Sequence, residues 1–261
     1  MYEKKDGQYQ LELGTVNEGF IAVASGKGGV GKSTVTANLA VALSEAGYKV
    51  GVIDADIRGF SIPRILGVEE RPKAESENII IPPQANGIKV MSMGGLMEEE
   101  KPIIWRGPLL SKTFKQFVKE VRWGELDYLL FDLPPGTGDM PLNLMQQLPD
   151  SELMVVTTPQ VAATKVSGRV GRMADELDCD LLGVVENMSY YQCSECGAKE
   201  YIFGQGGGAE LAANLDTELL AELPLVTKVR ESSDQGEPIV TAEPGTEISQ
   251  KFFAIADKIT P

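Results

Sequence analysis

The most informative absence in this 261-residue sequence is histidine, which does not occur at all. Without imidazole there is no Ser-His-Asp triad, no Cys-His pair and no histidine general base. A transition-metal site would have to use cysteine, aspartate or glutamate, or ligands from another molecule. Any chemistry of this chain therefore rests on other side chains.

Cysteine and positive charge are also scarce. Three cysteines are too few for the disulfide framework of a small secreted protein. With 24 Lys and Arg against 38 Asp and Glu, the net charge is −14, so we expect neither nucleic acid nor membrane as a partner. No apolar run reaches the roughly 18 residues of a membrane-spanning helix, and the N-terminal residues lack the apolar stretch of a secretory signal. These features predict a cytoplasmic protein.

Short apolar runs alternate with segments of helical periodicity along most of the chain. This alternation predicts one α/β domain, with a mostly parallel sheet flanked by helices on both faces. We place it at residues 19–261, after a polar N-terminal arm over residues 1–18, and expect a hairpin of Ile79–Ile81 and Ile88–Met91 around an Asn-Gly turn. The expected strands are Phe20–Ser25, Lys49–Ile53, Tyr128–Phe131, Leu153–Thr157, Leu181–Glu186 and Leu219–Leu223. The expected helices are Ser33–Ala46, Leu109–Val121, Ala162–Leu177 and Glu247–Lys258.

A glycine-rich segment lies between the first expected strand and the first expected helix. It matches the phosphate-loop pattern G-x-x-x-x-G-K-[ST] and reads Gly26-Lys27-Gly28-Gly29-Val30-Gly31-Lys32-Ser33, followed by Thr34. In such a loop the backbone amides converge on phosphate oxygens, Lys32 neutralises the β- and γ-phosphates, and the Ser33 hydroxyl binds Mg²⁺. Because the flanking strand and helix supply the context that the motif requires, the segment predicts a nucleotide site.

A second lysine, Lys27, lies inside this loop, where the general pattern does not require one. Two interpretations stay open on physical grounds. Lys27 is either a solvated loop charge, or a cation that reaches across a dimer interface to the γ-phosphate held by the partner chain, as an arginine finger does. Only the second makes nucleotide chemistry depend on a homodimer.

Carboxylates follow two of the expected strands. Asp54 and Asp56 come at the end of one strand, and Asp132 closes another. At the carboxyl edge of a parallel sheet, beside a phosphate loop, such groups are placed to bind Mg²⁺ or its waters. The alternative is that they stabilise turns or helix starts.

The sequence favours adenine over guanine. Guanine-selective loops usually carry Asn-Lys-x-Asp, whereas Asn187-Met188-Ser189-Tyr190 keeps the asparagine and lacks the aspartate. The amide of Asn187 can hydrogen-bond adenine, or Asn187 can be a simple turn residue at a strand end.

Two cysteines, Cys193 and Cys196, form a C-x-x-C pair in a loop expected at about residues 188–205. A tight turn brings two such thiols to one side, where they can bind one metal centre. On its own the pair is also compatible with a redox motif, with half of a zinc site, or with two cysteines that have no shared role. A tetrahedral zinc site or an iron–sulfur cluster needs about four ligands, and two chains meeting at a twofold axis would supply four thiolates.

The combination of these motifs resembles a known group of proteins. The loop Lys27–Ser33 is similar to the deviant Walker A motif of the MinD/ParA/nitrogenase-iron-protein superfamily of dimeric ATPases. Further blocks resemble Mrp/ApbC-type iron–sulfur cluster carriers: Asp54–Pro63, Trp105–Pro108, Asp132–Asp139, and Glu186–Ser189 followed by Cys193 and Cys196. Phe60 departs from this pattern, because proline is usual after the preceding glycine.

The resemblance implies roles for individual residues. Lys27 would act across the dimer, Asp56 would orient the attacking water, Asp54 and Asp132 would support Mg²⁺, and Pro224 would contact the adenine. Cys193 and Cys196 of two chains would bridge one [4Fe–4S] cluster. The implied function is a slow ATPase that carries the cluster to apo iron–sulfur proteins.

Two other functions stay open. The first is a MinD/ParA-like positioning ATPase, for which the cysteine pair has no role and the C-terminal helix has few basic residues. The second is a dimeric ATPase whose interface holds a structural zinc ion on four cysteines.

Overall fold

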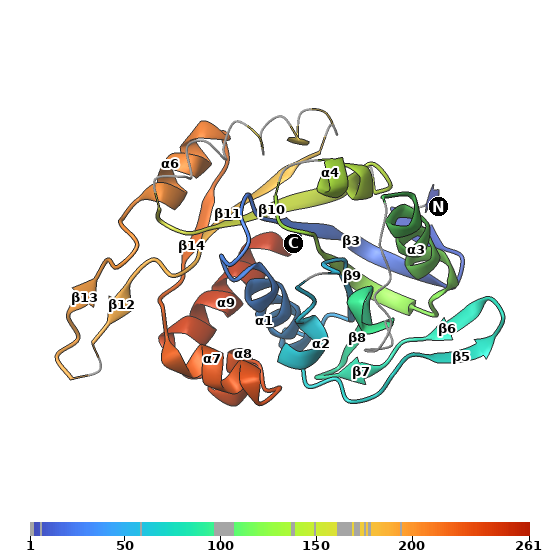
Figure 1. Ribbon diagram of the computed structural model, residues 1–261, viewed down its shortest axis with the longest axis horizontal. Helices are drawn as coiled ribbons and strands as arrows, with labels where there is room; N and C mark the ends of the chain where they lie inside the picture. The colour runs from blue at the N-terminus through green and yellow to red at the C-terminus, as the bar shows by residue number, and fades with distance from the viewer. Residues whose placement is uncertain are drawn as a thin grey trace.

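The computed structural model describes residues 3–5, 7–57, 59–96, 107–136, 139–148, 150–160, 169, 173–174, 176, 179–193 and 195–261. Across these residues ten strands form one central sheet, in the order β14-β11-β10-β3-β9-β4-β8-β7, with β2 and β1 attached beside β3 (Figure 1). The parallel strands are β3 Gly14–Ala24, β4 Val50–Asp54, β8 Ile88–Ser92, β9 Gly124–Asp132, β10 Ser151–Thr157, β11 Leu181–Glu186 and β14 Leu219–Glu222. Their continuous apolar runs suit strands that are covered on both faces.

Helices cover the two faces of this sheet (Figure 1). One face carries α1 Lys32–Glu45, α2 Ile62–Ile65, α7 Thr227–Asp234, α8 Ile239–Ala242 and α9 Glu247–Ile259. The other carries α3 Gly107–Glu120, α4 Asp139–Met145 and α6 Gly207–Asn214. The predicted architecture is therefore confirmed, although most of the expected helix Ala162–Leu177 and part of the block Trp105–Pro108 lie outside the described residues. No described helix is both long and apolar enough to cross a bilayer.

The structure corrects the expectation of a polar arm over residues 1–18. Residues Glu3–Lys5 form β1, Gln8–Leu11 form β2, and β3 already starts at Gly14. Tyr9 and Leu11 are buried, and the ring of Tyr9 lies 4.7 Å from that of Phe20. The average polarity of the segment hid the alternation in β2, where Tyr9 and Leu11 face the core and Gln8 is exposed.

The expected hairpin also forms differently. Asn86 and Gly87 make the turn with positive φ of 51° and 75°, as predicted. The strand that pairs antiparallel with β8 across this turn is β7 Gln84–Ala85, not Ile79–Ile81. Ile79–Ile81 is instead β6, which pairs with β5 Lys73–Ser76, because Pro82 and Pro83 interrupt the chain before the turn.

Candidate functional site

The phosphate-loop segment connects β3 to α1 in a conformation that only glycine adopts easily. Gly29 and Gly31 have φ of 80° and 81°. A Cβ atom on Gly31 would also lie 2.2 Å from Nδ2 of Asn187. Both the backbone angle and the lack of space therefore require glycine at this position.

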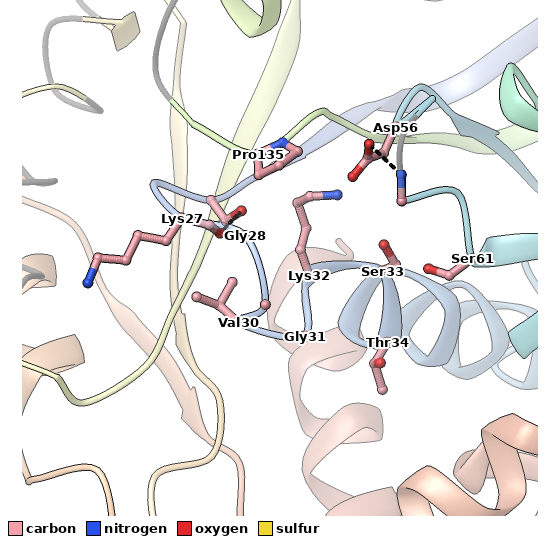
Figure 2. Close-up of a pocket in the computed structure, with 13 residues that line it drawn as sticks. Lys27, Gly28, Val30, Gly31, Lys32, Ser33, Thr34, Asp56, Ser61 and Pro135 are labelled. Carbon is pink, nitrogen blue, oxygen red and sulfur yellow. Dashed lines mark hydrogen bonds between the residues drawn. The ribbon is translucent and has the colours of Figure 1, made fainter. Parts of the chain in front are cut away.

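A cavity of about 380 Å³ opens over this loop (Figure 2). Backbone of the loop lines one side, together with Lys32 and Ser33 from the first turn of α1, while Asp56 approaches from the loop after β4. The full lining is Ser25, Lys27, Gly28, Gly29, Val30, Gly31, Lys32, Ser33, Thr34, Asp56, Gly59, Ser61 and Pro135. Loop amides, a helix N-terminus and a lysine together suit the phosphates of a nucleotide. The predicted residues from Lys27 to Thr34 thus meet in one cavity, whereas Gly26 is not part of its lining.

Beneath the cavity, Asp132 is fully buried and accepts hydrogen bonds from three side chains. Its Oδ1 lies 2.7 Å from Nζ of Lys32, and its Oδ2 lies 2.6 Å from the hydroxyl of Ser33. The hydroxyl of Thr36 lies 2.9 Å from Oδ1. The expectations from sequence missed Thr36, although its position one helical turn after Lys32 places both on one face of α1. Lys32, Ser33 and Asp132, the residues expected to bind phosphate and Mg²⁺, are therefore hydrogen-bonded to one another in this structure.

Asp54 and Asp132 lie opposite each other on adjacent strands, but Asp54 does not line the cavity. Its carboxylate is buried and accepts hydrogen bonds from the backbone amides of Asp56, Ser61 and Ile62 at 3.1, 3.2 and 3.3 Å. Asp54 therefore shapes the loop that brings Asp56 to the cavity. Asp54 and Asp56, which the sequence places at the end of the same strand, therefore occupy different environments.

Burial, and then the charge of Asp132, raise the pKa of Asp54 from 3.8 to about 7. The folded state therefore holds a proton that the unfolded chain releases between these values, so rising pH favours unfolding. In protein without nucleotide and with a chelator, we expect the free energy of unfolding to fall with rising pH between about pH 5 and 7. The contribution of Asp54 to this fall is up to about 1.4 kcal/mol per pH unit. Urea unfolding of wild type and Asp54→Asn measures this difference, and equal slopes in the two proteins would contradict it.

Lys27 is exposed at the rim of the cavity. Figure 2 shows its side chain extending away from Lys32 and Asp56. Its backbone is held in place, because the hydroxyl of Ser25 donates to the Lys27 carbonyl at 3.0 Å. A fixed backbone with an outward side chain suits a contact with another molecule better than one with phosphates in its own loop.

Asn187 and Pro224, expected on the adenine side, do not line the cavity. Asn187 follows β11, is buried and donates from Nδ2 to the carbonyl of Val30 at 2.8 Å. In this structure it braces the phosphate loop. Pro224 is buried after β14.

The cysteine pair lies apart from the cavity, on a hairpin that extends from the domain (Figure 1). The hairpin consists of β12 Tyr191–Gln192 and β13 Lys199–Glu200. The amide of Gly197 donates to the Cys193 carbonyl at 2.9 Å and closes the turn. Cys193 is half-buried and Cys196 is exposed, so their thiols are accessible to a metal centre.

The environment of Cys193 favours the thiolate. Hydrogen bonds from the backbone amides of Cys196 and Glu195, and then from the Cys196 thiol, hold the pKa of Cys193 below its usual value. By contrast, burial and the charges of Asp180 and Glu152 raise the pKa of Cys179 to about 11. The thiolate that binds metal is thus favoured at Cys193 and disfavoured at Cys179.

Fold and loop geometry define the class of this protein: it is a P-loop NTPase of the MinD/ParA type. The chain matches, over residues 17–260, the ParA family model described as NUBPL iron-transfer P-loop NTPase. It belongs to that family.

Several curated relatives carry one name. The chain is 51% identical over 206 residues to the "Iron-sulfur cluster carrier protein" of Bacillus subtilis, covering 79% of this chain and 58% of the relative. It is 47% identical over 241 residues to the protein of that name from Haemophilus influenzae, covering 92% and 65%. The chain therefore spans about two thirds or less of the length of these relatives.

Solved structures agree with the fold. A nucleotide-binding protein from Archaeoglobus fulgidus in complex with ADP superposes with a TM-score of 0.76 at 42% identity, covering 90% of this chain and 91% of the other. The septum site-determining protein MinD from Pyrococcus horikoshii, complexed with Mg-ADP, has a TM-score of 0.70 at 27% identity, covering 93% and 96%.

Proposed function

We propose that this protein is a nucleotide-dependent carrier of iron–sulfur clusters that delivers its cargo to apo-proteins. The observation that carries the proposal is the accessible cysteine pair, with a stabilised Cys193 thiolate, on a hairpin of a P-loop domain. The name of the relatives and the description of the family support the same cargo.

The cargo is a [4Fe–4S] cluster shared by two copies of the chain. Such a cluster takes four cysteine ligands, whereas the hairpin offers Cys193 and Cys196 and the sequence offers no histidine. A twofold axis beside the hairpin would bring four equivalent thiolates together. Assembly as a homodimer and loading with the cluster are then one event.

The nucleotide is ATP with Mg²⁺, and hydrolysis is slow. When bound, Mg²⁺ neutralises charge on the β- and γ-phosphates, and Ser33 and Asp132 are the residues placed to hold it or its waters. Lys32 exchanges its bond to Asp132 for the phosphates, Asp56 orients the attacking water, and Lys27 of the partner chain stabilises the transition state. Asp54 acts by positioning the loop that carries Asp56.

A MinD-like positioning ATPase is the second candidate, because MinD is a structural neighbour. A membrane-binding helix would need a free apolar face. In α9 that face is packed on the domain, with Ile248, Phe252 and Ile255 all buried. Cluster carriage remains the function that also uses the cysteines.

Metal and sulfide analysis of protein purified without oxygen tests the proposal. We expect iron and acid-labile sulfide in equal amounts, and transfer of both to an apo-ferredoxin. Stoichiometric zinc without sulfide would instead show a structural zinc bridge and overturn the carrier function.

A further inference from the structure

Glu186, the last residue of β11, places a carboxylate in the interior of the protein. Its side chain is 1% exposed. Oε1 accepts a hydrogen bond from the hydroxyl of Ser189, and Oε2 accepts one from the backbone amide of Gly208. Both donors are neutral, so this buried carboxylate depends on them for the stabilisation that water no longer provides.

The two donors stand on either side of the cysteine hairpin. Ser189 precedes the hairpin and Gly208 follows it, in the first turn of α6. The start of α6 packs closely against Pro159 and Glu186 because its first two residues are glycines. A Cβ on Gly207 would lie 2.5 Å from the Pro159 carbonyl oxygen, and one on Gly208 would lie 2.6 Å from Cβ of Glu186. One carboxylate thus holds both ends of the segment that carries the cysteines.

The next residue connects the same point to the nucleotide site. Asn187 donates to the Val30 carbonyl inside the phosphate loop. A shift of this loop on phosphate binding would act on Asn187 through this bond, and Glu186, which holds the hairpin, is the adjacent residue. The backbone of both residues is tied to neighbouring segments, since the amide of Asn187 donates to the Thr157 carbonyl at 2.8 Å and that of Leu223 to the Glu186 carbonyl at 2.8 Å. A force on Asn187 would therefore pass to Glu186 and is not absorbed by a loose loop.

We propose that Glu186 is a positioning residue that couples the phosphate loop to the cysteine hairpin, so that nucleotide changes the affinity of Cys193 and Cys196 for metal. This inference rests on the proposed function, because it requires that the pair binds a metal centre. Coupling of this kind changes an affinity by about 5- to 150-fold, and it is reciprocal between the two ligands.

Titration with Co²⁺ under anaerobic conditions tests the coupling, with thiolate-to-cobalt absorption as the readout. For wild type, we expect the Co²⁺ dissociation constant to differ at least about 5-fold between protein without nucleotide and protein saturated with a non-hydrolysable ATP analogue and Mg²⁺. In Glu186→Gln the amide nitrogen cannot accept a hydrogen bond, so one end of the hairpin is released and the ratio should fall to about 1. A merely structural effect would change both constants and leave their ratio intact.

The matched control is Glu222→Gln, because Glu222 lies opposite Glu186 in register on β14 but is exposed. It should keep the wild-type ratio. If Glu186→Gln fails to fold, Ser189→Ala removes one donor alone and should reduce the ratio. A wild-type ratio in the variant that folds, Glu186→Gln or otherwise Ser189→Ala, overturns the inference, and so does the lack of a nucleotide effect in wild type. Absence of any Co²⁺–thiolate band in wild type counts against the metal-binding cysteine pair itself.

Discussion

Lys27→Ala is expected to lower the rate of ATP hydrolysis by about 1,000-fold or more, the loss seen when a finger cation is removed. Nucleotide affinity should stay near that of wild type, because the Lys27 side chain is exposed and extends away from its own cavity (Figure 2). Steady-state phosphate release and binding of a fluorescent ATP analogue measure the two effects. Lys115→Ala, at another exposed position, serves as the control and should change neither.

Mixing variants tests whether Lys27 acts across the dimer. A dimer of one Lys27→Ala chain and one Lys32→Ala chain contains one intact composite site, in which the loop of the first chain receives Lys27 from the second. Random pairing at equal concentration makes half of the dimers mixed, so about a quarter of wild-type activity should return. If mixing restores nothing although mixed dimers form, Lys27 acts within its own chain. If Lys27→Ala alone hydrolyses ATP at the wild-type rate, Lys27 is a solvated loop charge.

Replacing Cys193 and Cys196 with serine is expected to abolish binding of iron and sulfide during anaerobic reconstitution. A serine hydroxyl is a far poorer ligand for this cluster than a thiolate, and each chain contributes only this pair to the proposed site. ATP binding should persist, because neither cysteine lines the nucleotide cavity. The loaded wild type should elute as a dimer in size-exclusion chromatography, and the variant should lack that cluster-dependent dimer.

Cys179→Ser is the matched control for this experiment. Its thiol donates to the carbonyl of Ser151 at 2.8 Å, and a serine hydroxyl can replace that bond. The control should load as much iron and sulfide as wild type. If the Cys193→Ser and Cys196→Ser variants instead load as much iron and sulfide as wild type, the bridging cluster is disproved.

Much of the nucleotide site was predictable because its chemistry is local. A phosphate loop needs a fixed spacing of glycines, lysine and serine between a strand and a helix, and that spacing is visible in residues 26–33. Residues 27–33 of this segment line one cavity. The separate environments of Asp54 and Asp56 were not predictable, because burial and the turn after β4 distinguish them only in three dimensions.

Glu186 shows the opposite case. Its partner Ser189 is near in the chain, but Gly208 reaches the carboxylate only when α6 packs against β11. The glycines at residues 206–208 are typical of a flexible joint, whereas Gly207 and Gly208 are buried and allow close packing. Non-local contacts of this kind leave little signal in a single sequence.

Sequence alone determined the α/β class, the phosphate loop and the cysteine pair, because each depends on periodicity or on the spacing of neighbouring residues. The absence of histidine further restricted the metal chemistry to thiolates and carboxylates. Tertiary structure alone decided that residues 8–18 join the sheet, that Asp54 shapes a loop and that Asn187 braces the phosphate loop. The physical reason is that burial and hydrogen-bond partners are set by segments that lie far apart in the chain and meet only in the folded protein.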